Sequence, residues 1–398
     1  MMGKPRRFAA ASAAIALALT PAPPFAQTSA VQVEQAVPAY ENPPLGNIPI
    51  ALIMDADGGA PFYEKDADRR FIPASLTKLM TMYTAFELLD AKRITLNQRM
   101  PVTRQIFKEW GGVGSTMFAS AGETISVDTL LQGITTVSAN DGCVILASGA
   151  AGSVEGWTAL MNANAKKLGM VNSHFNTPNG WPDEGRTYTS ARDLAILARA
   201  LITEHPTLYR RYFSILSFTH NDITQKHHNP ILEAVPGADG LKTGFTNEAG
   251  YGFVGSAVQG NRRLIMVLGG AETSRERKKV AREFIQWGFD EWDADYVFGH
   301  GQPVGKARVQ GGASRHVPVA AAQGVKISVP RGQQAEANVI MRYEGPLMAP
   351  IRKGQPVGQL IVQRAGEEPA SFDLVATEEV PAANGWQRLR NGFLGLFG

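Results

Sequence analysis

The sequence has almost no cysteine. Cys143 is the only one among 398 residues, so no intramolecular disulfide can form, and no cysteine lies near the start of the chain to carry a lipid. Gly142 and the apolar run Val144–Leu146 flank it. We therefore expect Cys143 to be buried as a small hydrophobic side chain. A reactive thiol is the alternative.

The sequence also lacks an excess of charge of either sign. Its formal net charge is +3, and three basic residues, Lys4, Arg6 and Arg7, lie in a segment that we expect to be removed. The remaining chain is then close to neutral, which argues against a protein that binds nucleic acid. No phosphate-binding loop is present. No metal-ligand cluster stands out either, because His227 and His228 are adjacent and their side chains point apart in regular structure.

Long hydrophobic runs are missing as well. The apolar run from Phe8 to Leu19 is well short of the roughly 20 residues that a transmembrane helix needs. Basic residues precede this run and small residues follow it, which is the order found in secretory signal peptides. Residues 1–26 are therefore predicted to be a signal peptide and the protein to be exported. Cleavage after Ala22 or Ala30 remains an alternative.

With 44% hydrophobic residues, the chain is long enough for two domains. Residues 27–44 lack periodicity and are predicted to be an extended leader. Residues 45–292 combine strands with a long helical stretch, in which Ser126 and Ser190 are predicted to cap helices. Residues 300–376 carry short alternating apolar runs separated by glycine and proline, which predicts a small all-β domain.

The last residues have a different pattern. Residues 384–398 place Trp386, Leu389 and Phe393 largely on one helical face, with Arg388 among the cations nearby. This pattern predicts an amphipathic tail that lies in a membrane surface. A frayed tail, or a helix docked on its own domain, is the alternative.

The stretch around Ser75 and Lys78 organises the rest of the chain. Apolar side chains recur at three- and four-residue steps after Ser75, which predicts a largely buried helix that begins there. Ser75 and Lys78 are then neighbours on one helical face. A lysine whose pKa is lowered by burial can take the proton of a serine hydroxyl and so make it a nucleophile. Alone, this spacing is common, and a helix cap with a snorkelling lysine is the better explanation of it.

Two further motifs follow in order. Ser138-Ala139-Asn140 is predicted to lie at a turn linked to a helix, and Lys242-Thr243-Gly244 on a strand. Taken singly, Ser138 and Asn140 could be turn formers, and Lys242 a solvated charge. Together with Ser75-x-x-Lys78, they form the motif set of penicillin-interacting serine enzymes.

On these motifs the chain resembles the low-molecular-mass penicillin-binding proteins that are serine-type D-alanyl-D-alanine carboxypeptidases. The resemblance runs from about residue 45 to the C-terminus and includes the stretches 190–193 and 236–251. It implies an α/β (α+β) penicillin-binding fold in which an antiparallel sheet is flanked by helices, followed by a small all-β domain. Residues 45–292 would then be the catalytic domain.

The resemblance implies a two-step acyl transfer. Ser75 would attack the carbonyl between the two terminal D-alanines of a peptidoglycan stem peptide, and water would then hydrolyse the acyl-enzyme. Lys78 would activate Ser75, and Ser138 would relay a proton to the leaving amine. The reaction would limit cross-linking of the cell wall at the periplasmic face of the cytoplasmic membrane. It would need no cofactor or metal, and β-lactams would be covalent inhibitors.

The same resemblance implies a set of substrate-binding residues. Asn140 would hold the substrate amide, and Lys242 would attract the terminal carboxylate and lower the pKa of Lys78. Backbone N–H groups of Ser75 and Phe245 would form the oxyanion hole. The other implied substrate-binding residues are Thr243, Gly244 and Thr246. Several relatives carry histidine or tyrosine where this chain has Phe245, which leaves the substrate preference open.

Three alternatives remain at this point. A class A β-lactamase shares the motifs, but it needs a glutamate for deacylation, and no E-x-x-L-N pattern lies between Ser138 and Lys242. A D,D-endopeptidase cannot be separated by motifs alone, although such enzymes usually lack the extra β-domain. A non-catalytic binder of muropeptides would tolerate the loss of Ser75 or Lys78, and both are present.

Overall fold

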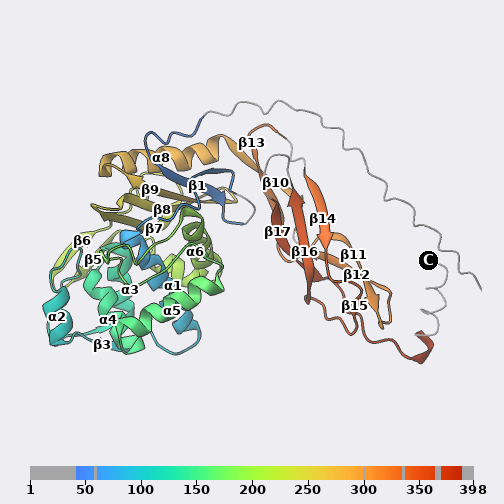
Figure 1. Cartoon of the computed structure of the whole chain (residues 1–398), viewed down its shortest axis with the longest axis horizontal. Helices are drawn as coiled ribbons and strands as arrows, with labels where there is room; N and C mark the ends of the chain where they lie inside the picture. The colour runs from blue at the N-terminus through green and yellow to red at the C-terminus, as the bar shows by residue number, and fades with distance from the viewer. Residues whose placement is uncertain (1–41, 58–60, 300, 334–336, 364–368, 388–398) are drawn as a thin grey trace, which may run out of the picture. The chain divides into compact units, whose positions relative to one another are not determined.

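A five-stranded antiparallel sheet lies in the first part of the chain, in the strand order β2-β1-β9-β8-β7 (Figure 1). Its strands are β1 (Ile50–Asp55), β2 (Tyr63–Lys65), β7 (Ala238–Thr246), β8 (Gly250–Gln259) and β9 (Arg262–Ala271). The computed structural model describes residues 42–57, 61–299, 301–333, 337–363 and 369–387. The predicted signal peptide at 1–26 lies outside these residues, as do most of the predicted leader and of the tail.

Both faces of this sheet are covered by helices, which explains why β1 is apolar at nearly every position. Ile50 and Leu52 belong to the larger hydrophobic core, on the side of α1. Ala51 and Ile53 belong to a second core, on the side of α8 (Ser274–Asp290). Because successive side chains of a strand point to opposite faces, one strand contributes to both cores.

The helices come mainly from the middle of the chain. They are α1 (Lys78–Asp90), α2 (Arg104–Trp110), α3 (Val127–Thr136), α4 (Asn140–Ala151), α5 (Val154–Lys167), α6 (Ala191–Thr203) and α7 (Pro206–Tyr212). Two short antiparallel strand pairs accompany them, β3 (Arg99–Pro101) with β4 (Thr124–Ser126) on either side of α2, and β5 (Ser217–His220) with β6 (Ile223–Lys226) after α7. The predicted caps are confirmed, since Ser126 accepts from the backbone N–H of Thr129 and Ser190 from that of Asp193.

The prediction that an α-helix begins at Ser75 is wrong in one respect. Ala74–Thr77 form a 3₁₀ turn, η1, and α1 begins at Lys78. Ala74 has a φ of 49°, which is uncommon for a residue other than glycine. A 3₁₀ turn and an α-helix have nearly the same side-chain spacing, so apolar periodicity cannot tell them apart. The two motif residues therefore lie in consecutive elements.

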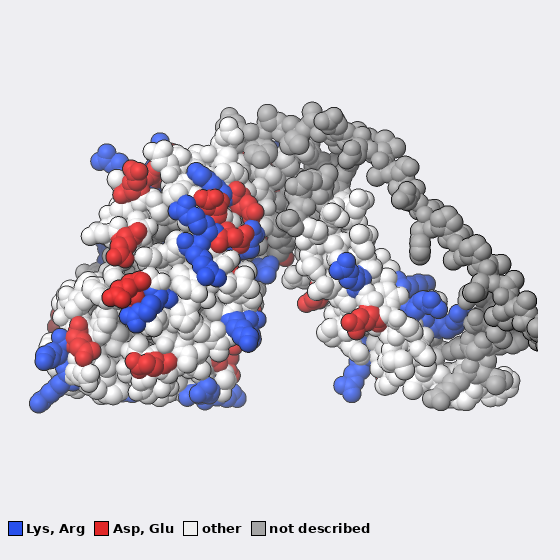
Figure 2. Space-filling model, in the orientation of Figure 1, with Lys and Arg blue, Asp and Glu red and all other residues white. Residues whose placement is uncertain are grey.

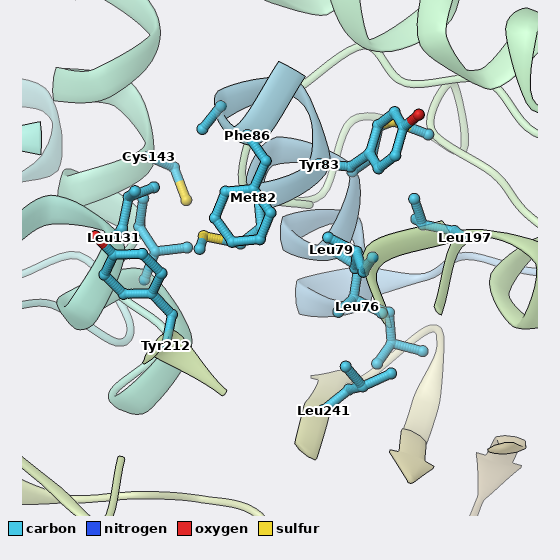
Figure 3. Close-up of a cluster of buried hydrophobic side chains, with 14 of the residues drawn as sticks. Leu76, Leu79, Met82, Tyr83, Phe86, Leu131, Cys143, Leu197, Tyr212 and Leu241 are labelled. Atoms are coloured by element: carbon cyan, nitrogen blue, oxygen red, sulfur yellow. The ribbon is translucent and has the colours of Figure 1, made fainter. Parts of the chain in front are cut away.

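Helix α1 is buried over most of its length. Figure 3 shows Met82 and Phe86 of α1 on the side of Cys143, with Leu79 and Leu197 elsewhere in the same cluster. Cys143 is fully buried, as predicted, and burial raises the pKa of its thiol to about 12. A neutral buried thiol is a poor nucleophile, so Cys143 contributes to packing.

The second part of the chain is built from β-strands, as predicted. The strands are β10 (Trp292–Phe298), β11 (Pro303–Gln310), β12 (His316–Ala321), β13 (Val325–Pro330), β14 (Asn338–Arg342), β15 (Leu347–Met348), β16 (Pro356–Gln363) and β17 (Ala370–Ala376). Strands β10 and β13 pair with each other, and the other six form one sheet in the order β14-β16-β17-β12-β11-β15. Val319, Phe372 and Leu374 lie in its apolar core.

Charged side chains of both signs are interspersed on the face of the molecule drawn in Figure 2. No single helix within the described residues has the length and apolar character to cross a membrane, although α4 and α5 together pass that test as a pair bent by 89°.

Candidate active site

The two residues of the first motif are in direct contact. Lys78 Nζ donates to Ser75 Oγ at 2.9 Å, to Asn140 Oδ1 at 2.8 Å and to the backbone oxygen of Asn179 at 2.6 Å. An ammonium has three protons to donate, so these three acceptors fix its position. The structure thus brings together parts of the first two sequence motifs around one amine.

Burial changes the acidity of this amine. Lys78 is fully buried, and this lowers its pKa to about 8, while the nearby carboxylate of Asp141 acts in the opposite direction. A pKa near 8 makes the neutral amine accessible close to neutral pH. We expected the charge of Lys242 to lower this pKa, but the lowering comes from burial. Repulsion between the two amines acts at Lys242, where burial and the charge of Lys78 both lower the pKa.

The second motif lies where α4 begins. Ser138 is buried and has a φ of 62°, a left-handed conformation that redirects the chain just ahead of the helix. Asn140 starts α4, and its side-chain Nδ2 donates to the backbone oxygen of Val113 at 3.1 Å. This bond orients the amide so that its oxygen faces Lys78.

Asp141 is a structural residue of the site that the sequence analysis did not identify. Its buried carboxylate accepts from Thr116 Oγ1 at 2.5 Å, and from the backbone N–H of Met117 at 3.0 Å and of Ala119 at 3.3 Å. These bonds hold residues 116–119 against the start of α4. Its position directly after Ser138-Ala139-Asn140 was the available signal.

The third motif lies on β7, which forms one edge of the five-stranded sheet. Lys242 and Thr243 are buried, and Lys242 Nζ donates to the backbone oxygen of Thr243 at 3.0 Å. Phe245 is 46% exposed and stacks on Tyr251 with ring centroids 4.1 Å apart. Thr246 Oγ1 accepts from the backbone N–H of Ala249 at 3.1 Å. An edge strand can pair with an extended peptide.

Gly244 allows β7 to approach the turn that carries Ser75. A Cβ at this position would lie 2.7 Å from the backbone oxygen of Pro73 and 3.0 Å from Leu76 Cγ. Only glycine fits such a close approach without displacing backbone. The glycine of this motif therefore sets the distance between β7 and η1.

The loop 176–183 completes the site. The backbone oxygen of Asn179 accepts from Lys78, and that of Pro178 accepts from Thr81 Oγ1 at 2.6 Å. Gly180 has a φ of 73°, and a Cβ there would lie 1.7 Å from the backbone oxygen of Ala74. The sequence shows that this loop is rich in turn-forming residues. It does not show that the loop contacts residues about 100 positions earlier in the chain.

Two more charged or titratable groups surround Lys242. Arg277 of α8 is buried, and its guanidinium lies over the ring of Tyr251 at 5.6 Å. Its charge contributes to lowering the pKa of Lys242. Burial, and then the charge of Lys242, lowers the pKa of His228 to about 4, so this ring is neutral at pH 7. Nothing in the sequence linked these two residues to the site.

The arrangement can carry out nucleophilic catalysis. It offers a hydroxyl in contact with a buried amine, an amide oriented toward that amine, and an edge strand with a second buried amine. The group of residues that could hold a metal ion, Glu87, Glu204 and His205, lies at the opposite end of α1.

Comparisons with known proteins agree with this arrangement. The model of a family described as D-alanyl-D-alanine carboxypeptidase, peptidase S11, matches residues 43–273. A model described as the C-terminal domain of penicillin-binding protein 5 matches residues 292–382. The D-alanyl-D-alanine carboxypeptidase DacF of Bacillus subtilis is 32% identical over 345 residues, which cover 84% of this chain and 86% of the relative.

Solved structures are similar as well. Penicillin-binding protein 5 of Haemophilus influenzae has a TM-score of 0.75 at 32% identity, and the match covers 85% of this chain and 99% of the other. Penicillin-binding protein D2 of Listeria monocytogenes, solved in an ampicillin-bound form, has a TM-score of 0.55 at 30% identity and covers 61% of this chain and 97% of its own. The predicted fold class, an antiparallel sheet flanked by helices with a separate all-β part, is confirmed.

Proposed function

Since this chain belongs to the peptidase S11 family of D-alanyl-D-alanine carboxypeptidases, we propose that Ser75 is its nucleophile and Lys78 the base that activates it. The enzyme is a serine-type carboxypeptidase that removes the terminal D-alanine of peptidoglycan stem peptides through an acyl-enzyme. The observation that carries the assignment of residues is the 2.9 Å contact between Lys78 Nζ and Ser75 Oγ, at a fully buried amine. Two of the alternatives left open by the sequence, a class A β-lactamase and a non-catalytic binder of muropeptides, are not favoured by the family match.

The reaction follows from this contact. Neutral Lys78 takes the Oγ proton while Ser75 Oγ bonds to the carbonyl carbon of the penultimate D-alanine. The peptide C–N bond then breaks, and the leaving amine takes a proton, which Ser138 relays. After D-alanine has left, water attacks the ester in the second step, and Ser75 regains its proton. The backbone N–H groups of Ser75 and Phe245 stabilise the oxyanion in both steps.

Substrate binding is assigned to the rest of the motifs. Asn140 holds the amide of the stem peptide, and the charge of Lys242 attracts the terminal carboxylate. Thr243, Gly244 and Thr246 lie along the same strand, where an extended peptide pairs with the edge. β-Lactams bind at the same place, as the ampicillin-bound relative suggests, and leave a stable ester on Ser75.

The decisive experiment compares the mature protein with Ser75→Ala on diacetyl-Lys-D-Ala-D-Ala. Mass spectrometry should detect released D-alanine and a penicillin adduct with the first protein and neither with the second. Ser214→Ala is the matched control and should keep full activity. Ser214 is exposed, and its hydroxyl donates to the backbone oxygen of Arg210 in α7. Activity retained by Ser75→Ala would refute the assignment.

Export and membrane contact are part of the proposal. The signal-like residues 1–26 would direct the chain to the periplasm, and the amphipathic residues 384–398 would hold it at the cytoplasmic membrane. Trp386, which is 81% exposed, supports a role for the tail. Fractionation of cells that express the chain with and without residues 384–398 tests this. The full chain should sediment with membranes, and the shortened chain should be released in the periplasmic fraction.

A further inference from the structure

A second cluster of polar side chains lies at the end of α1 remote from Ser75. Glu87 belongs to the last turn of α1, Glu204 follows α6, and His205 precedes α7. One ligand atom of each lies within 4.8 Å of the other two. Within the described ranges no other three His, Cys, Asp or Glu side chains meet in this way. The cluster is distinct from the catalytic residues and has no part in the proposed reaction.

The imidazole of His205 has an unsatisfied nitrogen in this cluster. Its side chain is 2% exposed, and Nδ1 lies 2.7 Å from Asp90 Oδ2. A carboxylate only accepts, so Nδ1 carries the proton, and in the neutral ring Nε2 then presents a lone pair. Nε2 has no hydrogen-bond partner and lies 3.4 Å from Glu87 Oε1. Two lone pairs that face each other in a buried place need a cation or a second proton between them.

The spacing suits a tetrahedral metal ion. Zinc binds histidine nitrogen and carboxylate oxygen at about 2.0 to 2.2 Å, so two ligands of one tetrahedral ion lie about 3.4 Å apart. The observed separation of His205 Nε2 and Glu87 Oε1 has this value. The His205 ring is also fixed by edge contacts with Tyr83 and Phe86, at centroid distances of 5.2 and 5.6 Å.

Each candidate ligand is oriented by a partner of its own. Asp90 holds the Nδ1 side of His205, in the arrangement common for metal-binding histidines. Lys167 Nζ bonds Glu87 Oε2 at 2.6 Å and leaves Oε1 free to face His205. The hydroxyl of Tyr83 donates to Glu204 Oε2 at 2.7 Å. Such outer contacts are typical of metal sites, whose ligands must be held in place before the ion binds.

The two helix ends also favour a cation, beside Lys167, which pairs with Glu87, and Arg199, which lies near Glu204. The last turns of α1 and α6 contain no basic residue, although the C-terminal end of a helix carries a partial negative charge. Carboxylates collect there instead, with Glu87 and Asp90 on α1 and Glu204 after α6. A positive ion between the two helix ends would offset both effects.

We propose that Glu87, Glu204 and His205 bind a divalent transition-metal cation, with Zn²⁺ the best match. An imidazole with two carboxylates suits zinc, whereas Ca²⁺ and Mg²⁺ prefer all-oxygen sites. Glu204 is exposed, so the ion can enter from solvent, and water would complete the coordination. Because Glu87 lies nine residues after Lys78, about 14 Å along the helix, the ion ties α1 to the α6–α7 junction and does not take part in acyl transfer.

Calorimetric titration of the mature chain, without a histidine tag, with ZnCl₂ tests the proposal. One saturable site is expected, together with a rise in melting temperature of about 5 °C or more at free Zn²⁺ near a hundred times Kd, reversed by EDTA. Glu204→Gln should weaken binding at least tenfold. Its amide oxygen can still accept from Tyr83, so the fold is kept. MgCl₂ should have no such effect.

His227→Gln is the matched control. Its Nε2 faces Glu233 Oε2 at 3.0 Å and its Nδ1 accepts from the backbone N–H of Asn229, so both nitrogens are occupied. This variant should bind Zn²⁺ like the parent. Absence of a saturable site, or full affinity in Glu204→Gln, would overturn the proposal. Absence of a site would mean that a proton, and not a metal ion, lies between His205 and Glu87.

Discussion

The two parts of the chain bury different kinds of side chain. The first part, up to residue 291, buries Lys78, Lys242 and Asp141 beside its apolar cores. From residue 292 onward, Lys326 is the only charged side chain that is buried among the described residues. The core there consists of apolar side chains, many of them valine.

The difference separates chemistry from packing. Burying a charged group costs free energy unless it is paired or its pKa shifts. The first part bears this cost at two lysines whose pKa values are both lowered by burial. A lowered amine pKa is useful to a base and gives no benefit to packing. We therefore expect substitutions in the first part to change activity, and those in the second part to change stability alone.

Loss of the buried amine should have the largest effect. Lys78→Met keeps the length of the side chain but removes the base, and acylation by penicillin should slow about 10³-fold or more. Stopped reactions followed by mass spectrometry measure the rate. Lys226→Met, at an exposed lysine of β6, is the control and should acylate at the parent rate. A decrease of less than tenfold in Lys78→Met would contradict the role of Lys78.

Displacement of the nucleophile turn should have the next largest effect. In Gly180→Ala the new Cβ would meet the backbone oxygen of Ala74 at 1.7 Å, and a shift of about 1 Å in the nucleophile costs about 10²-fold in kcat. Gly185→Ala has the same backbone strain, with a φ of 77°, but no atom within 4 Å. Comparing kcat of the two variants isolates the clash. Equal losses would mean that strain alone matters.

The acylation rate should depend on pH through Lys78. Only the neutral amine accepts a proton, and its fraction falls about tenfold per pH unit below a pKa of about 8. The rate should therefore decrease from pH 8 to pH 6. His228→Gln should keep the same inflection, because the pKa of His228, about 4, lies below this range. A flat profile between pH 6 and 9 would argue against a base with this pKa.

Substitutions in the second part should change the stability of the protein and leave its activity unchanged. Leu374 of β17 is fully buried, and Leu374→Ala should lower the free energy of unfolding by about 2 to 5 kcal/mol while kcat stays unchanged. Denaturant unfolding and kcat are measured on the same samples. Leu79→Ala, the same substitution beside Lys78, should reduce both. If Leu374→Ala lowered kcat as strongly as Leu79→Ala, the separation of the two parts would fail.

Much of the fold followed from local patterns. The caps at Ser126 and Ser190 and the all-β second part were predicted, because alternation, capping residues and turn formers act over a few positions. The start of α1 was predicted three residues too early, at Ser75. Side-chain spacing does not distinguish a 3₁₀ turn from an α-helix, and the packing of Gly180 and Gly244 against that turn depends on distant segments.

The sequence by itself determined the chemical groups of the site. Ser75, Lys78, Ser138, Asn140 and Lys242 stood out because an activated hydroxyl needs a base and a polar environment. Only the tertiary structure decided what surrounds them. It supplied the backbone oxygen of Asn179, the carboxylate of Asp141 and the guanidinium of Arg277. It also decided that Lys78 is fully buried. The pKa of an amine depends on its desolvation and on nearby charges, and both are created when segments about 100 residues apart pack together.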